Sequence, residues 1–239
     1  MLYDMARTFS LTKHRLVFSR LFTRHRFLML FLFLLATLIA YPYTEGHGFG
    51  YYAFRVLGGL VVALSVFVVS FGRGLAVVAF LLAIPAMVQH VLNPGLTAGF
   101  FPIANLVLSF TFDVWIVVSI FRRVFSNVRI TSETIFGALC IYLLNGMSFA
   151  SIYGLVSDLQ PSAFFLDPAV NRHTIPDRFD FIFYSFGMMT QLGAAGINAV
   201  SDQARSLSVI EAILGQLYLA VLISRLIASY RITPPAANS

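Results

Sequence analysis

Charged residues are scarce in this chain. Only 11% of the 239 residues are charged, whereas 59% are hydrophobic and the mean hydropathy is +0.84. A soluble domain of this length could not bury so much apolar surface, so the surplus must face lipid. The single cysteine, Cys140, excludes an intrachain disulfide, and its place in an apolar run is typical of a small buried residue.

The short motifs of common catalytic and cofactor sites are also missing. The sequence contains no HExxH, GxSxG, Walker, CxxC or GxGxxG pattern, and its five histidines lack metal-ligand spacing. We therefore expect no enzyme activity, no cofactor and no metal beyond transient cations. The net charge of +6 does not indicate nucleic acid, because basic residues in a membrane protein usually report topology and contact with anionic lipid.

Long apolar runs are what the chain does have. Polar or Gly/Pro-bearing breaks separate six of them, at residues 27–43, 54–71, 75–92, 104–121, 135–156 and 204–228. A helix needs about 20 residues to cross the hydrocarbon core, so the first four are at the short end. The sequence predicts an all-α integral membrane protein with six transmembrane helices.

The basic residues indicate the orientation of these helices. With six spans both termini lie on one side, and only four of the 16 Lys and Arg residues fall on the other, at Arg55, Arg172, Arg178 and Arg205. The more basic side is cytoplasmic. We therefore expect a multi-pass plasma-membrane protein with cytoplasmic termini, in which residues 1–26 form a basic amphipathic segment at the lipid surface.

The first four runs do not form a voltage sensor. Such a sensor needs Arg or Lys recurring through a span, but the fourth run has no basic residue before Arg122 and Arg123. We assign residues 27–121 to a four-helix membrane domain, 122–132 to a cytoplasmic linker, and 231–239 to a short cytoplasmic tail.

Residues 180–201 (DFIFYSFGMMTQLGAAGINAVS) lie between the last two apolar runs. They read as a short amphipathic helix followed by a Gly/Ala-rich loop too apolar for a surface turn. Non-helical backbone at membrane depth is tolerated where protein buries it or where it lines a water-filled cavity. A re-entrant helix that ends in such a loop is how ion-selectivity filters are built, so the pattern favours a pore.

Residues from about 129 to 230 resemble the pore domain of the tetrameric potassium-channel superfamily, above all its bacterial six-span members. The resemblance rests on residues 129–144 (RITSETIFGALCIYLL), 180–186 (DFIFYSF) and 204–226 (ARSLSVIEAILGQLYLAVLISRL). It implies a pore domain at 133–230, with an outer helix at 133–156, a pore helix at about 178–190, a filter loop at 191–197 and an inner helix at 204–229. It also implies a homotetramer in membrane lipid that passes potassium or sodium passively.

The filter differs from the family pattern, which runs Thr-x-Gly-Tyr-Gly-Asp. Here Thr190 ends the pore helix, and the residues that follow are Gln191, Leu192, Gly193, Ala194, Ala195 and Gly196. Gln191 stands in place of the threonine, and Ala194 in place of the bracing tyrosine. Alanine at a left-handed position is strained by about 1–2 kcal/mol. We therefore expect altered or relaxed selectivity.

Other residues of the pore unit allow two interpretations each. Gln191 could present a ring of four amide dipoles to an ion or form a structural hydrogen bond. Glu211 could lie behind the filter, bonded to loop amides or to Gln191, or could face the ion pathway. Gly215 could be a hinge of the inner helix or a close-packing site. A carboxylate in a span, at Glu211 or Asp113, needs a partner, a proton or water.

Two further functions compete with a channel. In a non-conducting membrane scaffold or modulatory subunit, the loop would be collapsed by Ala194 and Ala195. In a proton-coupled transporter, Asp113 and Glu211 would face one polar cavity within a single subunit.

Overall fold

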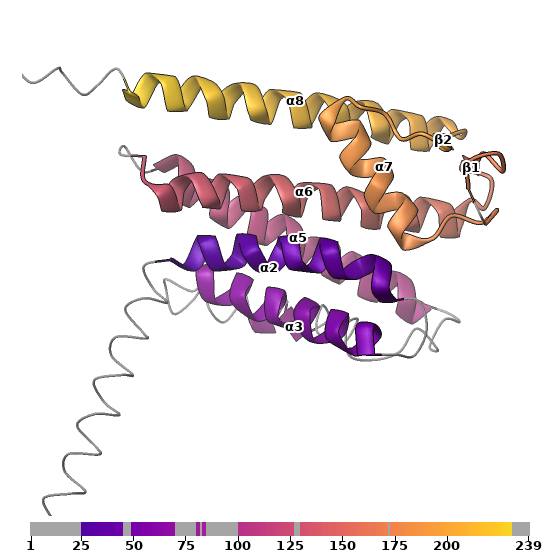
Figure 1. The fold of residues 1–239 in the computed structure, drawn as a ribbon, viewed down its shortest axis with the longest axis horizontal. Coiled ribbons are helices and arrows are strands. Elements are labelled where there is room, and N and C mark those ends of the chain that lie inside the picture. Colours follow the sequence, from indigo (N-terminus) through magenta and orange to yellow (C-terminus); the bar gives the residue numbers. More distant parts are fainter. Residues whose placement is uncertain are drawn as a thin grey trace, which may run out of the picture.

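The computed structural model describes residues 25–44, 49–69, 80–81, 83–84, 100–126, 130–171 and 173–230. These residues are mostly helical (Figure 1). The elements are α2 (Arg26–Ala40), η1 (Tyr41–Thr44), α3 (Phe49–Val69), α5 (Phe100–Ser126), α6 (Ser132–Leu159), β1 (Phe164–Leu166), α7 (Arg178–Thr190), β2 (Ile197–Ala199) and α8 (Asp202–Tyr230). Residues 1–24 of the predicted basic segment 1–26, the predicted tail 231–239 and most of the third apolar run lie outside the described residues.

Two of the described helices are long and apolar enough to cross a membrane. They are α6, over Ser132–Leu159, and α8, over Asp202–Ala228. At 1.5 Å per residue, 28 residues reach about 42 Å, more than the roughly 30 Å of hydrocarbon. The apolar stretches Arg26–Ala40 and Val56–Val69 are shorter.

Helices α2, α3, α5 and α6 share one apolar core. In Figure 1, α2, α3 and α5 lie on the side of α6 that faces away from α8. The side chains in this core that are least exposed are Leu30, Leu34, Val68, Ile116, Ile120, Val124, Ala138 and Cys140. Cys140 is fully buried and its thiol donates to the carbonyl of Phe27, as expected of a structural cysteine.

Helix α7 is wedged between α6 and α8. Figure 1 shows it starting beside the end of α6 and rising obliquely to the middle of α8. A second core surrounds it, in which Tyr153, Phe164, Phe181 and Tyr184 pack edge to face. Together these contacts fix a short helix that enters from one end of the α6–α8 pair and stops partway along it.

A small antiparallel ribbon completes this end of the fold. Strand β1 pairs with β2, with Phe165 opposite Asn198. The expectation of a purely helical protein was incomplete here, because the return path from α7 is held by strand pairing. Two three-residue strands are too short to show an alternating pattern in the sequence.

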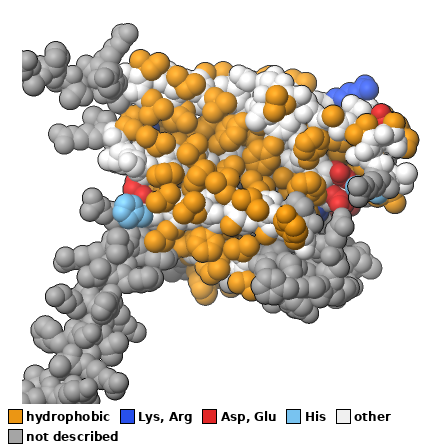
Figure 2. All heavy atoms as spheres, in the orientation of Figure 1, with side chains coloured by type: hydrophobic (Ala, Val, Ile, Leu, Met, Phe, Trp, Pro, Cys, Tyr) orange, Lys and Arg blue, Asp and Glu red, His pale blue; other side chains and the backbone are white. Residues whose placement is uncertain are grey.

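The outer surface of the described helices is apolar along their length. Figure 2 shows hydrophobic side chains over the middle of one face, with the charged side chains toward its two ends. Helix α8 contributes much of this surface, through the exposed residues Val209, Ile210, Ile213, Leu214, Leu217, Val221, Ile223 and Ile227. Such a band fits lipid or another protein surface better than water.

Candidate functional site

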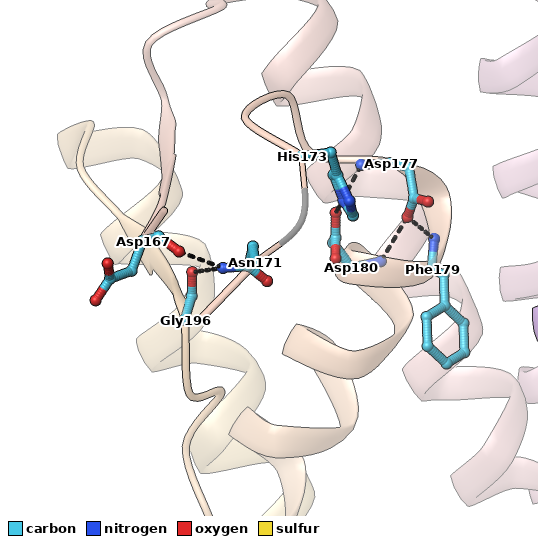
Figure 3. Close-up of polar contacts among 7 residues, drawn as sticks. All are labelled: Asp167, Asn171, His173, Asp177, Phe179, Asp180 and Gly196. Atoms are coloured by element: carbon cyan, nitrogen blue, oxygen red, sulfur yellow. Dashed lines mark hydrogen bonds and ion pairs between the residues drawn. The ribbon is translucent and has the colours of Figure 1, made fainter. Parts of the chain in front are cut away.

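The start of α7 is fixed by a reciprocal capping box. The Asp177 carboxylate accepts from the backbone N–H groups of Phe179 (2.7 Å) and Asp180 (2.9 Å), while Asp180 accepts from the N–H of Asp177 at 2.8 Å (Figure 3). His173 lies 2.7 Å from the same Asp180 oxygen. Potential metal ligands of His173, Asp177 and Asp180 lie within 4.8 Å of one another. Both carboxylates already serve the positive end of a helix, so we assign no metal here.

Glycines allow the last turn of α7 to sit tightly between α6 and α8. A Cβ on Gly146 of α6 would lie 2.8 Å from the ring of Phe186, and a Cβ on Gly215 of α8 would lie 3.0 Å from the Met189 carbonyl. Both glycines therefore mark close helix contacts. Gly215 was expected to be either a hinge or a close-packing site, and the structure shows the close packing against Met189.

Glu211 lies behind α7, fully buried. Its carboxyl group accepts from the Tyr153 hydroxyl of α6 at 2.6 Å and lies 2.5 Å from the Ser185 hydroxyl of α7. Ser185 also donates to the carbonyl of Gly146 at 2.7 Å. One interpretation had Glu211 bonded to loop amides or to Gln191, and these predicted hydrogen-bond partners are wrong. Glu211 instead joins all three helices around the loop, and it lies away from the exposed surface.

The chain reverses direction immediately after α7. Gln191 adopts a left-handed conformation at φ 62°, and Gly193 and Gly196 have φ values of 74° and 88°. The N–H of Gly193 donates to the carbonyl of Gly187 at 3.1 Å, which folds the loop back onto the helix. A Cβ on Gly187 would lie 2.5 Å from the Gly193 oxygen, so only glycine fits there.

The strain expected at the two loop alanines is found elsewhere. Ala194 and Ala195 do not have positive φ, and Gln191 is the non-glycine residue that does so among the described residues. Ala194 is buried in the core around α7, whereas Ala195 is exposed. The left-handed positions are therefore Gln191 and two glycines, Gly193 and Gly196. The glycines adopt this conformation readily because they have no Cβ.

The loop carbonyls divide into two groups. The carbonyl of Gly196 accepts from the N–H of Asp167 (2.8 Å) and from the side-chain amide of Asn171 (2.7 Å; the second contact is drawn in Figure 3). Ala194 accepts from the N–H of Ile197. The carbonyls of residues 191–193 and of Ala195 accept no hydrogen bond from the part of the chain described here. They are the ones available to a ligand.

Side chains at the tip of α7 point their polar groups toward the backbone. The Thr190 hydroxyl donates to the carbonyl of Phe186 at 2.6 Å. The Gln191 amide reaches the carbonyls of Met188 and Ala212, each at a long 3.4 Å. These contacts match the structural role considered for Gln191. The neighbouring Leu192 is 87% exposed, more than any other large hydrophobic side chain among the described residues.

Asp113 does not meet Glu211. It lies on α5 beside a cavity, and Glu211 is absent from the described residues that line this cavity. The two carboxylates therefore lack the shared cavity expected of a proton-coupled transporter.

Sequence reasoning missed four residues that shape the site: Tyr153, Ser185, Gly146 and Gly187. Each is a polar or small residue in an otherwise apolar helix, which is the available signal. Nothing local shows that Tyr153 and Ser185 meet Glu211, which is 58 and 26 residues away.

Comparisons with protein families, curated proteins and solved structures find no match to this chain.

Proposed function

We propose that this protein is a cation channel with relaxed selectivity, assembled as a homotetramer of six-span subunits in the plasma membrane. The observation that carries the proposal is the course of residues 178–199. Helix α7 enters between α6 and α8, ends partway along them in an exposed loop, and returns through β2. In a membrane this geometry puts irregular backbone at depth, where it requires burial or a water-filled path.

The tip of the loop has the chemistry of an ion pathway. Residues 191–193 are exposed, and their carbonyls are not used by the described residues. Helix α7 ends at this tip, so its negative dipole end favours a cation there. One chain supplies only one such tip. Several copies around an axis would bring these carbonyls together.

Relaxed selectivity follows from how few carbonyls are available. Those of Ala194 and Gly196 are bonded within the chain, which leaves a short stretch at residues 191–193 and the single carbonyl of Ala195. A potassium filter replaces the hydration shell of the ion with successive rings of carbonyls. A shorter stretch would leave the ion partly hydrated, so potassium and sodium would both pass.

The exposed face of α8 fits the same proposal. Its apolar residues would lie against lipid or neighbouring subunits, and the Arg225 guanidinium near its end donates to the carbonyl of Val124 on α5. Among the described residues of α5, basic side chains occur only at Arg122 and Arg123. We therefore expect ion flow that does not depend on voltage.

Cysteine modification at the loop tip tests the proposal. The protein is reconstituted in liposomes, and potassium and sodium flux is measured before and after a cationic methanethiosulfonate reagent. Wild-type flux should be unaffected, because its single cysteine is buried. Leu192→Cys should lose most of its flux after the reagent, whereas Phe165→Cys, exposed on β1, should keep it.

Two results would contradict the channel. Absence of flux from a tetrameric preparation would favour a non-conducting scaffold. Flux that is insensitive at Leu192→Cys, despite labelling of the thiol, would place the ion pathway elsewhere.

A further inference from the structure

A second site lies away from the loop, in a cavity bounded by α2, α3, α5, α6 and the start of α7. Its volume is about 710 Å³. Pockets that hold small organic ligands measure about 300–1,000 Å³. The described walls are mainly apolar and carry the aromatic side chains Tyr41, Phe110, Phe112, Phe164 and Phe181.

The cavity contains a carboxylate that has no counter-ion among the residues that the structure describes. Asp113 of α5 lines it and is half-buried, and no Lys, Arg or His among the described residues forms an ion pair with it. The Ser148 hydroxyl of α6 is the polar group close to Asp113, and because a hydroxyl is uncharged it does not balance the carboxylate. A carboxylate among apolar helices is costly unless a partner, a proton or water offsets its desolvation.

The charges along the described walls favour a cation. Asp113 and Asp158 line the cavity against one basic residue, Arg178, and the third carboxylate, Asp177, is already used to cap α7. Like-signed carboxylates around a low-dielectric cavity raise the local concentration of cations. Aromatic faces add attraction for an ammonium group within about 6 Å of a ring centroid. A ligand that fits must therefore combine a positive head with an apolar body.

We propose that this cavity binds a protonated alkylamine or a similar amphipathic organic cation, with its ammonium group on Asp113 and its chain against the apolar walls. This site is separate from the ion pathway: Gln191, Leu192 and Gly193 do not line it, and neither does Glu211. Binding can be measured without ion flux, so the proposal stands or fails independently of the channel.

The first test compares two ligands on the unmodified protein. Decylamine, protonated at neutral pH, and decanol are titrated into protein held in zwitterionic lipid nanodiscs, with empty nanodiscs as background. Fluorescence of Trp115, the single tryptophan and two residues from Asp113 on α5, reports binding. We expect saturable binding of decylamine, about tenfold or more tighter than decanol. Equal affinities, or no saturable binding above background, would overturn the proposal.

Three variants then locate the site. Asp113→Asn removes the charge and should weaken decylamine binding about tenfold while leaving decanol unchanged. Gly154→Leu should weaken both ligands, because Gly154 lines the cavity and a Cβ there meets nothing closer than 3.8 Å. Asp202→Asn, at the exposed start of α8, is the matched control. Unchanged decylamine affinity in Asp113→Asn would refute the assignment, and the wild-type comparison decides the question if that variant fails to fold.

Discussion

Tyr153 and Glu211 are joined by a 2.6 Å hydrogen bond in which the phenol of α6 donates to the buried carboxyl group of α8. The other carboxyl oxygen lies 2.5 Å from the Ser185 hydroxyl, which is also 2.7 Å from the carbonyl of Gly146. A hydroxyl has one hydrogen, and a carbonyl can only accept. If Ser185 donates to Gly146, a second hydrogen must come from Glu211. A neutral carboxylic acid at Glu211 therefore allows all three hydrogen bonds, with Tyr153 donating to Glu211, Glu211 donating to Ser185, and Ser185 donating to Gly146.

We predict that Glu211 is protonated in the folded protein at neutral pH. Infrared difference spectra between wild type and Glu211→Gln should show the C=O stretch of a protonated carboxylic acid, lost in the variant. Asp113→Asn removes another carboxyl group among the apolar helices and is the control, and it should leave the Glu211 band in place. A carboxylate band lost on Glu211→Gln would show that the group is ionised.

The same network predicts a contrast between two Glu211 variants in stability. Glutamine can accept from Tyr153 and donate to Ser185, so Glu211→Gln should change the free energy of unfolding by less than about 1 kcal/mol. Glu211→Leu leaves the Tyr153 hydroxyl buried without this partner, whereas Ser185 keeps the carbonyl of Gly146, and one unsatisfied buried group costs about 1–3 kcal/mol. Thermal unfolding in detergent measures the difference. Equal stability of the two variants would mean that the hydrogen bonds contribute little.

Local patterns in the sequence predict much of the secondary structure in residues 178–230. The expected short helix at about 178–190 corresponds to α7 at Arg178–Thr190, and the helix expected at 204–229 corresponds to α8, which starts two residues earlier at Asp202. The resemblance supplied these bounds, and it rested on an amphipathic stretch after residue 180 and an apolar run at 204–228, which are properties of neighbouring residues. The six-span count, the orientation and the tetramer remain predictions.

Contacts between distant residues could not be predicted in the same way. The partners of Glu211 lie on two other helices, and the β1–β2 ribbon pairs residues that are about 30 positions apart. The left-handed conformation was expected at the loop alanines because the filter pattern of the potassium-channel superfamily was matched to residues 190–196. The structure instead places it on Gln191, where α7 ends, since a helix C-terminus commonly closes with such a residue.

The left-handed turn at Gln191 leads to a prediction about strain. Gln191→Gly should raise the free energy of unfolding by about 1 kcal/mol, because glycine adopts φ 62° without a Cβ clash. The matched control is Gln160→Gly, since Gln160 also follows a helix but has φ −136°. That substitution should be destabilising by about 0.5–1 kcal/mol through chain entropy. Equal effects of the two substitutions on thermal unfolding would argue against strain at Gln191.

The contact between Gly187 and Gly193 leads to the last prediction, which concerns the shape of the loop. In Gly187→Ala the new methyl group would lie 2.5 Å from the Gly193 oxygen, which is backbone and cannot rotate away. The loop must therefore move off α7, breaking the 3.1 Å hydrogen bond from Gly193 to Gly187. We expect a loss of about 1–3 kcal/mol in the free energy of unfolding, as for other overpacked sites.

Gly154→Ala is the matched control for this change, because its Cβ would meet nothing nearer than 3.8 Å in the same apolar environment. It should unfold at or slightly above the wild-type temperature, because alanine is favoured over glycine within a helix by about 0.5–1 kcal/mol. In liposomes, Gly187→Ala should also change the ratio of potassium to sodium flux, since the carbonyls of residues 191–193 would be displaced, whereas Gly154→Ala should leave the ratio unchanged. If Gly187→Ala is destabilised but conducts with an unaltered ratio, the loop beside Gly187 does not line the ion pathway.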